Sequence, residues 1–336
     1  MASGAPYAHV GGRLAAGLVD VTDDPRALDT HGFWVVVGTF EGRWTCARFR
    51  DVIASDAPQT AWAGPAREAW TSSLDVDGYV TRVEEVRRLI AAGTVYQVNL
   101  CRVLRAPMHR AASLDGLAGV LAAGNPAPFA ARVYLPDADV DLVSASPELF
   151  LRRDGARLAS APIKGTGRVA ADLTGKDVAE NVMIVDLVRN DLSRVCRTGS
   201  VAVHDALAVE THPGLVQLVS TVTGDLADGQ GWADVLRATF PPGSVSGAPK
   251  STALTTIADL ETTARGPYCG ALGWVDADAS RAELAVGIRT FWREGGSLCF
   301  GTGAGITWGS DPQREWRETE LKAAHLLGLA SSDGRS

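Results

Sequence analysis

Segments typical of β-strands follow one another along this chain of 336 residues with only short turns between them. Residues 31–40 and 43–49 are two such runs, separated by a Glu-Gly pair, and another two surround Asp154 and Gly155, a dipeptide that favours a hairpin turn. Further strand-like runs are residues 94–104, 131–135, 140–146, 200–203 and 215–226. Strands joined by tight turns pair antiparallel, whereas a doubly wound fold needs a helix between successive strands. The pattern therefore predicts an α+β fold with antiparallel sheets.

Three stretches show the hydrophobic spacing of three to four residues that is typical of helices. Residues 176–196 repeat valine and leucine at this spacing. Residues 77–92 begin with Asp77, a residue type that caps helix starts, and end at Gly93. Residues 311–328 begin with an Asp-Pro pair, which favours a helix start. We therefore expect three main helices beside the strands.

The composition excludes several classes of protein. The formal net charge is −7, which argues against a nucleic-acid-binding protein, because such proteins need a basic face to contact phosphates. No segment approaches the run of about 20 apolar residues that a membrane helix needs, and the N-terminus has no apolar signal segment. The five cysteines lack CxxC spacing and the six histidines lack the spacing of a zinc site. We expect a cytoplasmic protein with reduced cysteines, no nucleic-acid or membrane partner, and oxygen ligands for any metal.

Two glycine-rich segments imitate nucleotide-binding loops. Residues 301–305 lie between strand-like runs and lack the GxGxxG spacing of a dinucleotide site. Residues 243–252 have the wrong spacing for a phosphate-binding P-loop, and Pro249 removes one backbone donor. Nucleotide binding is therefore a distant alternative, but backbone N–H groups in both segments suit an anion such as a carboxylate.

Acidic residues share a face on two of the predicted helices. Asp177 and Glu180 are three residues apart, and Glu315, Glu318 and Lys322 follow the spacing i, i+3, i+7. By periodicity alone, such stripes are typical of solvated helix faces with ordinary ion pairs. In the alternative interpretation the two groups face each other and hold Mg²⁺, which prefers few carboxylates, retained waters and a substrate oxygen.

Lysine is scarce, since only four of the 32 basic residues are lysine. Arginine cannot replace lysine where a deprotonatable amine is needed, so each remaining lysine is a candidate for such a role. Lys164 lies sixteen residues after Glu148, across a predicted hairpin. A carboxylate and an amine brought together in this way could perform acid–base and nucleophilic chemistry. The other lysines are Lys176, Lys250 and Lys322.

A colinear set of motifs over residues 94–326 resembles the chorismate-utilising enzymes. The motifs are YQVNLCR (96–102), SASPELFL (144–151), PIKGTGR (162–168), KDVAENVMIVDLVRNDLSRVCRTGSV (176–201), LVSTV (218–222), PPGSVSGAPK (241–250), RGPYCGALGW (265–274), GIRTFW (287–292) and SDPQREWRETELKA (310–323). The resemblance implies two large antiparallel β-sheets packed together, with helices on the outside and the active site in a cleft. It also implies a chorismate-binding catalytic domain over 76–330, preceded by a shortened N-terminal segment over 1–75 that contributes strands.

The resemblance assigns a role to individual residues. Glu148 matches the general acid/base that helps the C4 hydroxyl of chorismate leave, and Lys164 matches a nucleophile. The residues that match Mg²⁺ ligands are Asp177, Glu180, Glu315 and Glu318. The residues that match substrate-binding positions are Gln97, Thr166, Ser244, Tyr268, Arg289, Gly303, Gly305 and Lys322.

Two of these positions separate the branches of the family. In family members that add water to chorismate, a lysine acts as the base at the position of Gln97. Glutamine cannot act as a base, so this chain looks like a member that uses ammonia. Anthranilate synthases carry a small residue at the position of Lys164, whereas a lysine looks like component I of aminodeoxychorismate synthase. In that branch the lysine attacks C2, the C4 hydroxyl leaves, and ammonia adds at C4. The product, 4-amino-4-deoxychorismate, is a precursor of p-aminobenzoate and folate.

Ammonia must then be supplied by a partner. The sequence has no Gly-x-Cys-x-Gly elbow, so we expect a separate glutamine amidotransferase subunit. Three alternatives stay open: an anthranilate synthase component I-like activity, 2-amino-2-deoxyisochorismate synthesis, and a catalytically degenerate chorismate-binding protein. The last alternative is suggested by Gln217, which takes the place of the histidine usual in the family, and by the short N-terminal segment.

Overall fold

The computed structural model describes residues 4–55, 60–109, 112–167, 169–173, 175–212 and 215–332. Its strands are β1 (Tyr7–Val10), β2 (Arg13–Thr22), β3 (Phe33–Gly38), β4 (Trp44–Ala54), β5 (Thr71–Ser72), β6 (Gln97–Pro107), β7 (Phe129–Leu135), β8 (Val140–Ser146), β9 (Leu149–Asp154), β10 (Arg157–Ala161), β11 (Ile163–Gly167), β12 (Ala202–His212), β13 (Leu215–Asp225), β14 (Gly247–Ala248), β15 (Ala271–Asp276), β16 (Arg281–Val286), β17 (Thr290–Glu294) and β18 (Ser297–Ile306). Its α-helices are α1 (Val76–Ala91), α2 (Leu114–Gly124), α3 (Gly175–Ser193), α4 (Trp232–Thr239), α5 (Lys250–Leu260) and α6 (Pro312–Ala330).

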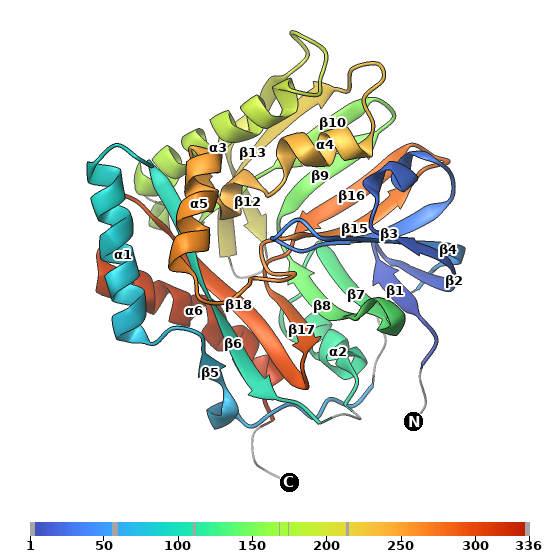
Figure 1. The fold of residues 1–336 in the computed structure, drawn as a ribbon, viewed down its shortest axis with the longest axis horizontal. Helices are drawn as coiled ribbons and strands as arrows, with labels where there is room; N and C mark the ends of the chain where they lie inside the picture. The colour runs from blue at the N-terminus through green and yellow to red at the C-terminus, as the bar shows by residue number, and fades with distance from the viewer. Residues whose placement is uncertain are drawn as a thin grey trace.

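The strands form one curled sheet in which the strand-to-strand pairing is antiparallel (Figure 1). One half runs β6–β18–β17–β8–β7, and the other runs β15–β16–β9–β10–β13 with β11 and β12 beside β13. The N-terminal strands β1, β2, β4 and β3 join the halves, because β1 pairs with β7 and β3 pairs with β15. The α+β prediction is confirmed. The two predicted sheets are therefore two halves of a continuous hydrogen-bonded sheet.

The predicted helices are present with shifted ends. The stretch predicted as 176–196 is α3, and the stretch predicted as 311–328 is α6, which begins after its N-cap Asp311. The helix predicted from Asp77 is α1, but its N-cap is Asp75, whose side chain accepts a hydrogen bond from the Gly78 N–H at 2.8 Å. The sequence places two aspartates near this helix start, and only the backbone conformation of Asp75 is extended as a cap requires.

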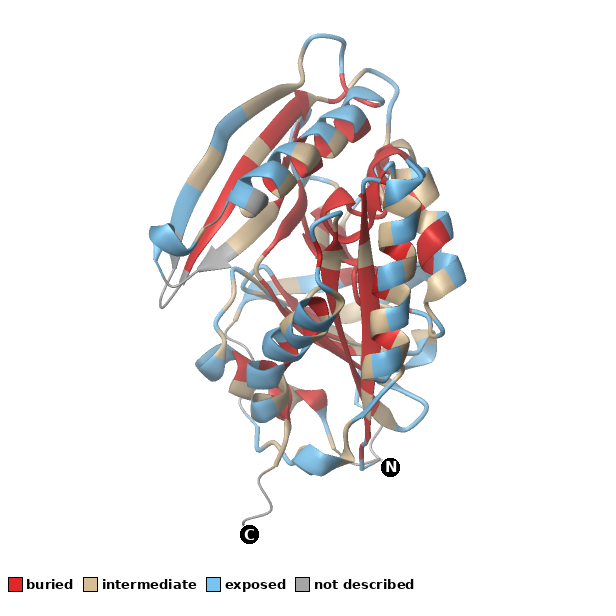
Figure 2. Ribbon diagram, turned by 90° about the vertical axis from the view of Figure 1, so that its left-hand side faces the viewer, coloured by how far each residue is buried: buried red, intermediate tan, exposed pale blue. Residues whose placement is uncertain are grey.

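Helices cover each half of the sheet on its outer side (Figure 1). In one half α3 packs on β13 and α4 packs on α3, whereas in the other α6 packs on β18, and α1 and α2 pack on α6. Figure 2 shows that buried residues concentrate on the strands and on the helix faces turned towards them. Hydrophobic helix faces are thus buried against the sheet.

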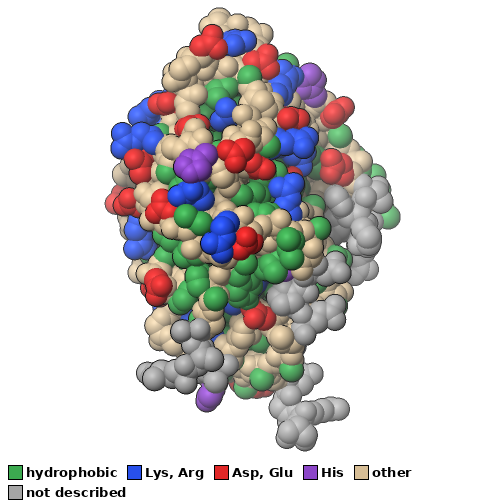
Figure 3. All heavy atoms as spheres, turned by 90° about the vertical axis from the view of Figure 1, so that its right-hand side faces the viewer, with side chains coloured by type: hydrophobic (Ala, Val, Ile, Leu, Met, Phe, Trp, Pro, Cys, Tyr) green, Lys and Arg blue, Asp and Glu red, His purple; other side chains and the backbone are tan. Residues whose placement is uncertain are grey.

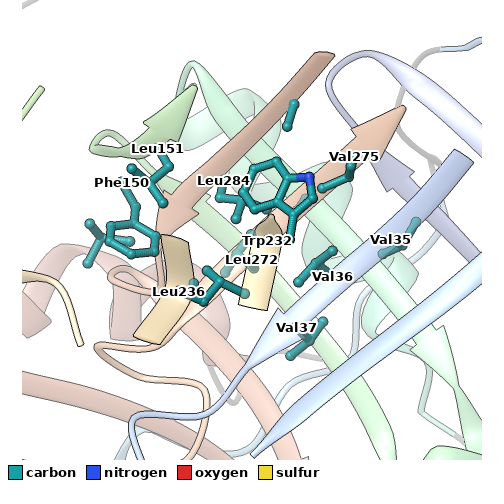
Figure 4. Close-up of a cluster of buried hydrophobic side chains, with 14 of the residues drawn as sticks. Val35, Val36, Val37, Phe150, Leu151, Trp232, Leu236, Leu272, Val275 and Leu284 are labelled. Atoms are coloured by element: carbon teal, nitrogen blue, oxygen red, sulfur yellow. The ribbon is translucent and has the colours of Figure 1, made fainter. Parts of the chain in front are cut away.

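The largest hydrophobic core lies between β3, β15, β16, β9 and α4. Figure 4 shows side chains from these elements pointing towards one another around Trp232, which is 1% exposed. The labelled members are Val35, Val36, Val37, Phe150, Leu151, Trp232, Leu236, Leu272, Val275 and Leu284. The core fixes the half of the sheet that carries β9 and β10, and with it the turn that bears Glu148 and the strand β11 that bears Lys164.

The outer face of β2 and β4 is more open. Figure 3 looks onto this side of the molecule, where hydrophobic side chains gather in the middle of the face among basic and acidic ones. Val19 and Ile53 are 50% and 61% exposed there. A hollow on this face is lined by Arg13, Phe33, Arg48 and further residues, none of which is a predicted site residue.

Candidate active site

Lys164 lies on β11, where β11 pairs with β13 in register with Leu218. Its amine donates a hydrogen bond to the backbone carbonyl of Ser244 at 2.9 Å, eighty residues further along the chain. Burial lowers the pKa of the Lys164 amine, the carboxylates of Glu180 and Glu148 oppose this effect, and nearby positive charge lowers it further. The amine is therefore closer to its neutral, nucleophilic form than an exposed lysine would be.

Glu148 lies in the turn between β8 and β9 and is 4% exposed. Burial raises the pKa of its carboxyl group, and a hydrogen bond from the Ser244 side chain together with the charges of Lys164 and Arg289 limits that rise. The Ile163 backbone N–H, one residue before Lys164, also lowers the pKa of this carboxyl group. The predicted acid/base and the predicted nucleophile therefore share one constellation, although a strand hairpin separates them in sequence.

Gln97 begins β6 and is 2% exposed. Gly305 lies beside it on β18, where a Cβ atom would come within 2.4 Å of the Gln97 Nε2 atom. The same Cβ position lies 3.8 Å from Oε2 of Glu180 on α3. A side chain at 305 would therefore displace the Gln97 amide. This contact also brings α3, from one half of the sheet, next to β18 of the other half.

The predicted carboxylates come from α3 and α6. Glu318 pairs with Lys322 at 2.7 Å, and the Lys322 amine also donates to the Gly303 carbonyl at 3.1 Å. Glu315 is 3% exposed and accepts a hydrogen bond from the Ser310 hydroxyl at 2.5 Å. These contacts place the α6 stripe against β18, so it is not a freely solvated helix face.

Asp177 lies on the first turn of α3, against β11. A Cβ atom at Gly165, whose φ is +70°, would come within 2.8 Å of the Asp177 Cβ. Glu180, one turn later, and Glu318 of α6 both act electrostatically on the Lys164 amine. Carboxylates of the two helices therefore converge on one region.

The donor set suits magnesium in type. It consists of carboxylate oxygens, and Mg²⁺ usually takes one or two protein carboxylates together with waters and substrate oxygens. Among the residues that the structure describes, no three His, Cys, Asp or Glu side chains gather into a ready-made metal cluster. A Mg²⁺ site on these helices thus stays a prediction, and it would have to be completed by water and substrate.

Arg289 acts on Glu148, whereas Tyr268 packs against β18. Tyr268 is 5% exposed, and its ring lies so close to Gly301 that a Cβ there would come within 2.0 Å of it. Arg289 has a left-handed backbone, with φ of 52°. Burial lowers the pKa of its guanidinium, and the charge of the Glu148 carboxylate opposes this effect. Thr166 pairs with Gln217 in the β11–β13 ladder, but its side chain lies outside what the structure describes.

Sequence reasoning missed the ion pair that supports this region. The side chains of Arg265 and Glu261 are only 2% and 7% exposed. Arg265 donates two hydrogen bonds to the Glu261 carboxylate, from Nη2 at 2.6 Å and from Nε at 2.8 Å. Arg265 also donates to the carbonyls of Val245 and Asn99, at 2.9 and 2.6 Å. The only signal in the sequence is an i, i+4 Glu–Arg spacing, which is common on exposed helices; burial and the long-range carbonyls identify its role.

Comparison with known proteins identifies a family for the chain. A sequence family described as chorismate binding enzyme matches residues 40–328. The chain belongs to this family. Anthranilate synthase component 1 from Haloarcula marismortui is 41% identical over 265 residues, which cover 75% of this chain and 53% of that protein. Aminodeoxychorismate synthase component 1 from Bacillus subtilis is 37% identical over 259 residues, with 74% and 54% covered. The chain thus spans about half the length of these relatives.

Solved structures share the fold at low sequence identity. Anthranilate synthase component I from Streptococcus pneumoniae superposes with a TM-score of 0.76 at 24% identity, covering 89% of this chain and 81% of that one. The menaquinone-specific isochorismate synthase of Escherichia coli gives a TM-score of 0.76 at 20% identity, with 97% and 89% covered. None of the helices that the structure describes has the length and apolar composition needed to cross a membrane.

Proposed function

We propose that this chain is the chorismate-converting component of an aminodeoxychorismate synthase, which replaces the C4 hydroxyl of chorismate with an amino group from ammonia. The observation that supports this most directly is that the Lys164 amine bonds to the Ser244 carbonyl, while the buried Glu148 carboxyl group lies beside the same residue and acts electrostatically on the amine. Relatives named aminodeoxychorismate synthase and relatives named anthranilate synthase match at similar identity, so the choice between them depends on this chemistry.

The proposed reaction uses the two groups in complementary protonation states. The neutral Lys164 amine attacks C2 of chorismate, the ring double bonds shift, and the C4 hydroxyl leaves as water with a proton from Glu148. Ammonia then adds at C4, the double bonds shift back, and the C2–N bond to Lys164 breaks. Burial favours both starting states, because it disfavours the charged form of an amine and of a carboxyl group alike.

Substrate binding would use the groups around this pair. Arg289 and Lys322 supply positive charge for carboxylates, and Tyr268, Gln97 and the glycines of β18 shape the wall. Mg²⁺ held by Glu180, Glu315 and Glu318, with Asp177, would neutralise the ring carboxylate and orient the ring when bound. A chelator should then abolish turnover reversibly without lowering the melting temperature.

The decisive experiment is product analysis with chorismate, ammonium and Mg²⁺. We expect 4-amino-4-deoxychorismate, and Glu148→Gln should lower the rate by roughly 10²–10⁴-fold. Lys164→Ala should lower it at least as much. Lys164→Arg keeps the positive charge but has no amine that can deprotonate, so it should be equally inactive. Anthranilate as the main product, or an active Lys164→Arg variant, would contradict the proposal.

An anthranilate synthase-like reaction is the second candidate. It is favoured by the relative from Haloarcula marismortui, at 41% identity. Ammonia would then attack C2 directly, and 2-amino-2-deoxyisochorismate would be the product if elimination did not follow. The Lys164 amine would crowd C2 in that reaction. Chorismate binding without turnover would instead indicate a degenerate binding protein.

The proposal includes a glutamine amidotransferase subunit as the source of ammonia. The curated relatives named component 1 fit an enzyme with a second component. The five cysteines are unpaired and buried, as suits a protein of the reducing cytoplasm. Glutamine should replace ammonium only after an amidotransferase subunit is added.

A further inference from the structure

Ser244 contacts both members of the proposed catalytic pair. It lies in a short helical turn (Gly243–Val245) and is 7% exposed. Its backbone carbonyl accepts the hydrogen bond from the Lys164 amine at 2.9 Å, and its side chain lies beside the Glu148 carboxyl group, whose pKa it lowers. Glu148 and Ser244 also line the same small cavity. One residue thus touches the proposed nucleophile with its main chain and the proposed acid with its side chain.

The turn that carries Ser244 is held by contacts independent of the substrate. The Ser246 hydroxyl donates to the Pro242 carbonyl at 3.1 Å, and the Asn99 N–H donates to the Ser246 carbonyl at 2.9 Å. The guanidinium of Arg265 donates to the carbonyl of Val245 at 2.9 Å. Because these bonds come from β6 and from the segment before β15, the Ser244 carbonyl has a fixed position before any ligand binds.

The two contacts have distinct chemical consequences. A neutral amine has two N–H donors and one lone pair, so the bond to the Ser244 carbonyl restricts the direction in which the Lys164 lone pair points. A hydroxyl that donates to a carboxyl oxygen restricts the rotation of the Glu148 carboxyl group and favours its charged form. Neither consequence requires Ser244 to touch chorismate.

We propose that Ser244 is a positioning residue that orients Lys164 through its carbonyl and Glu148 through its hydroxyl. This assignment replaces the substrate-binding role expected from the sequence, and it rests on the proposed function of Lys164 and Glu148. It predicts that the hydroxyl and the carbonyl act separately, since a side-chain substitution removes only the contact with Glu148.

The charged groups around Glu148 determine how its titration is interpreted. Lys164 from β11 and Arg289 from the segment before β17 face it, and both favour the carboxylate. Asp191 of α3 lines the same cavity, but it is paired with Lys250 at 2.5 Å. Ser244→Ala leaves all four of these groups in place, so a change in the titration of Glu148 would report the lost hydroxyl.

The test compares Ser244→Ala with Ser244→Thr, which restores a hydroxyl, and with Ser246→Ala, a matched loss of a buried hydroxyl that bonds only to carbonyls of its own turn. If Glu148 acts as an acid, activity falls as pH rises through its pKa. Removing a donor to the carboxylate raises that pKa, so the basic limb of the kcat profile should move up by roughly one pH unit. In Ser244→Ala kcat should also fall about tenfold while KM for chorismate stays within about twofold.

Ser244→Thr should return the basic limb towards the wild-type position, and Ser246→Ala should not move it. A raised KM with an unchanged kcat and pH profile in Ser244→Ala would overturn the proposal in favour of substrate binding. If Ser244→Ala does not fold, the pH profile of kcat in Ser244→Thr takes its place. A wild-type profile in Ser244→Thr supports the proposal, and a profile without the basic limb assigned to Glu148 contradicts it. The product made by the wild-type protein decides the proposed function, whereas the shift between variants decides the role of Ser244.

Discussion

Arg265→Met should destabilise the protein strongly, because it removes one partner of a buried ion pair. Methionine fills a similar volume but cannot bond to Glu261 or to the carbonyls of Val245 and Asn99, which together accept four hydrogen bonds from Arg265. The Glu261 carboxylate would stay buried with only the Cys101 N–H, at 2.9 Å, as a donor. Breaking a buried pair in this way costs roughly 3–5 kcal/mol.

The cost can be converted to a melting temperature from the length of the chain. An unfolding entropy of about 2.1 cal/mol/K per residue gives about 0.7 kcal/mol/K for 336 residues. The expected decrease in melting temperature is therefore roughly 4–7 °C, measurable by calorimetry, and urea unfolding should show the same loss without a changed slope.

A matched control is Arg88→Met, which breaks an exposed ion pair with Glu85. Arg88 is 66% exposed, so water and salt screen the pair, and its loss should leave the melting temperature close to that of the wild-type protein. Equal melting temperatures for Arg265→Met and Arg88→Met would refute the argument that burial gives the Arg265–Glu261 pair its weight.

Other predictions concern glycine packing, pH and thiol reactivity. Gly301→Ala should destabilise the protein by about 1–3 kcal/mol, because its Cβ would lie 2.0 Å from the Tyr268 ring. Gly328→Ala in α6 should stabilise the protein by about 0.5–1 kcal/mol, because no atom lies within 4 Å of its Cβ position. Thermal unfolding tests both variants, and equal effects would contradict the two predictions. Burial raises the pKa of Asp191 to about 6, so the folded state binds a proton that the unfolded state has released. The free energy of unfolding should fall by up to about 3 kcal/mol as pH rises from about 4 through about 6, and an equally steep fall in Asp191→Asn would refute this origin. Burial raises the pKa of Cys46 to about 12, so roughly one thiol in ten thousand is ionised at pH 8; iodoacetamide should modify it only after unfolding, as mass spectrometry would show.

Local features of the chain were predicted well. The Asp154–Gly155 turn joins β9 to β10, and Gly155 has φ of 59°, a conformation that glycine adopts at little cost. Asp311 caps α6 as its Asp-Pro pair indicated. The predicted N-cap of α1 was wrong by two residues, because both nearby aspartates are chemically suitable caps and the path of the preceding chain selects Asp75.

The candidate site was predictable as a set of residue types but not as a set of contacts. Motif order singled out Glu148, Lys164 and the acidic stripes of α3 and α6 as candidates. It did not show that Lys164 bonds to the carbonyl of Ser244, because every residue has a carbonyl and only the fold selects one. For the same reason the role of Arg265, which depends on carbonyls 20 and 166 residues away, could not be inferred from its spacing.

The sequence by itself determined the α+β class, the main helices and the chemical groups available to the site, since hydrophobic period, turn residues and side-chain chemistry are local properties. Only the tertiary structure decided that β1 to β4 join two halves into one curled sheet, and that Glu180 from one half meets Gly305 from the other. These contacts join residues more than a hundred positions apart. Their geometry follows from strand register and helix packing throughout the whole molecule, which no single segment contains.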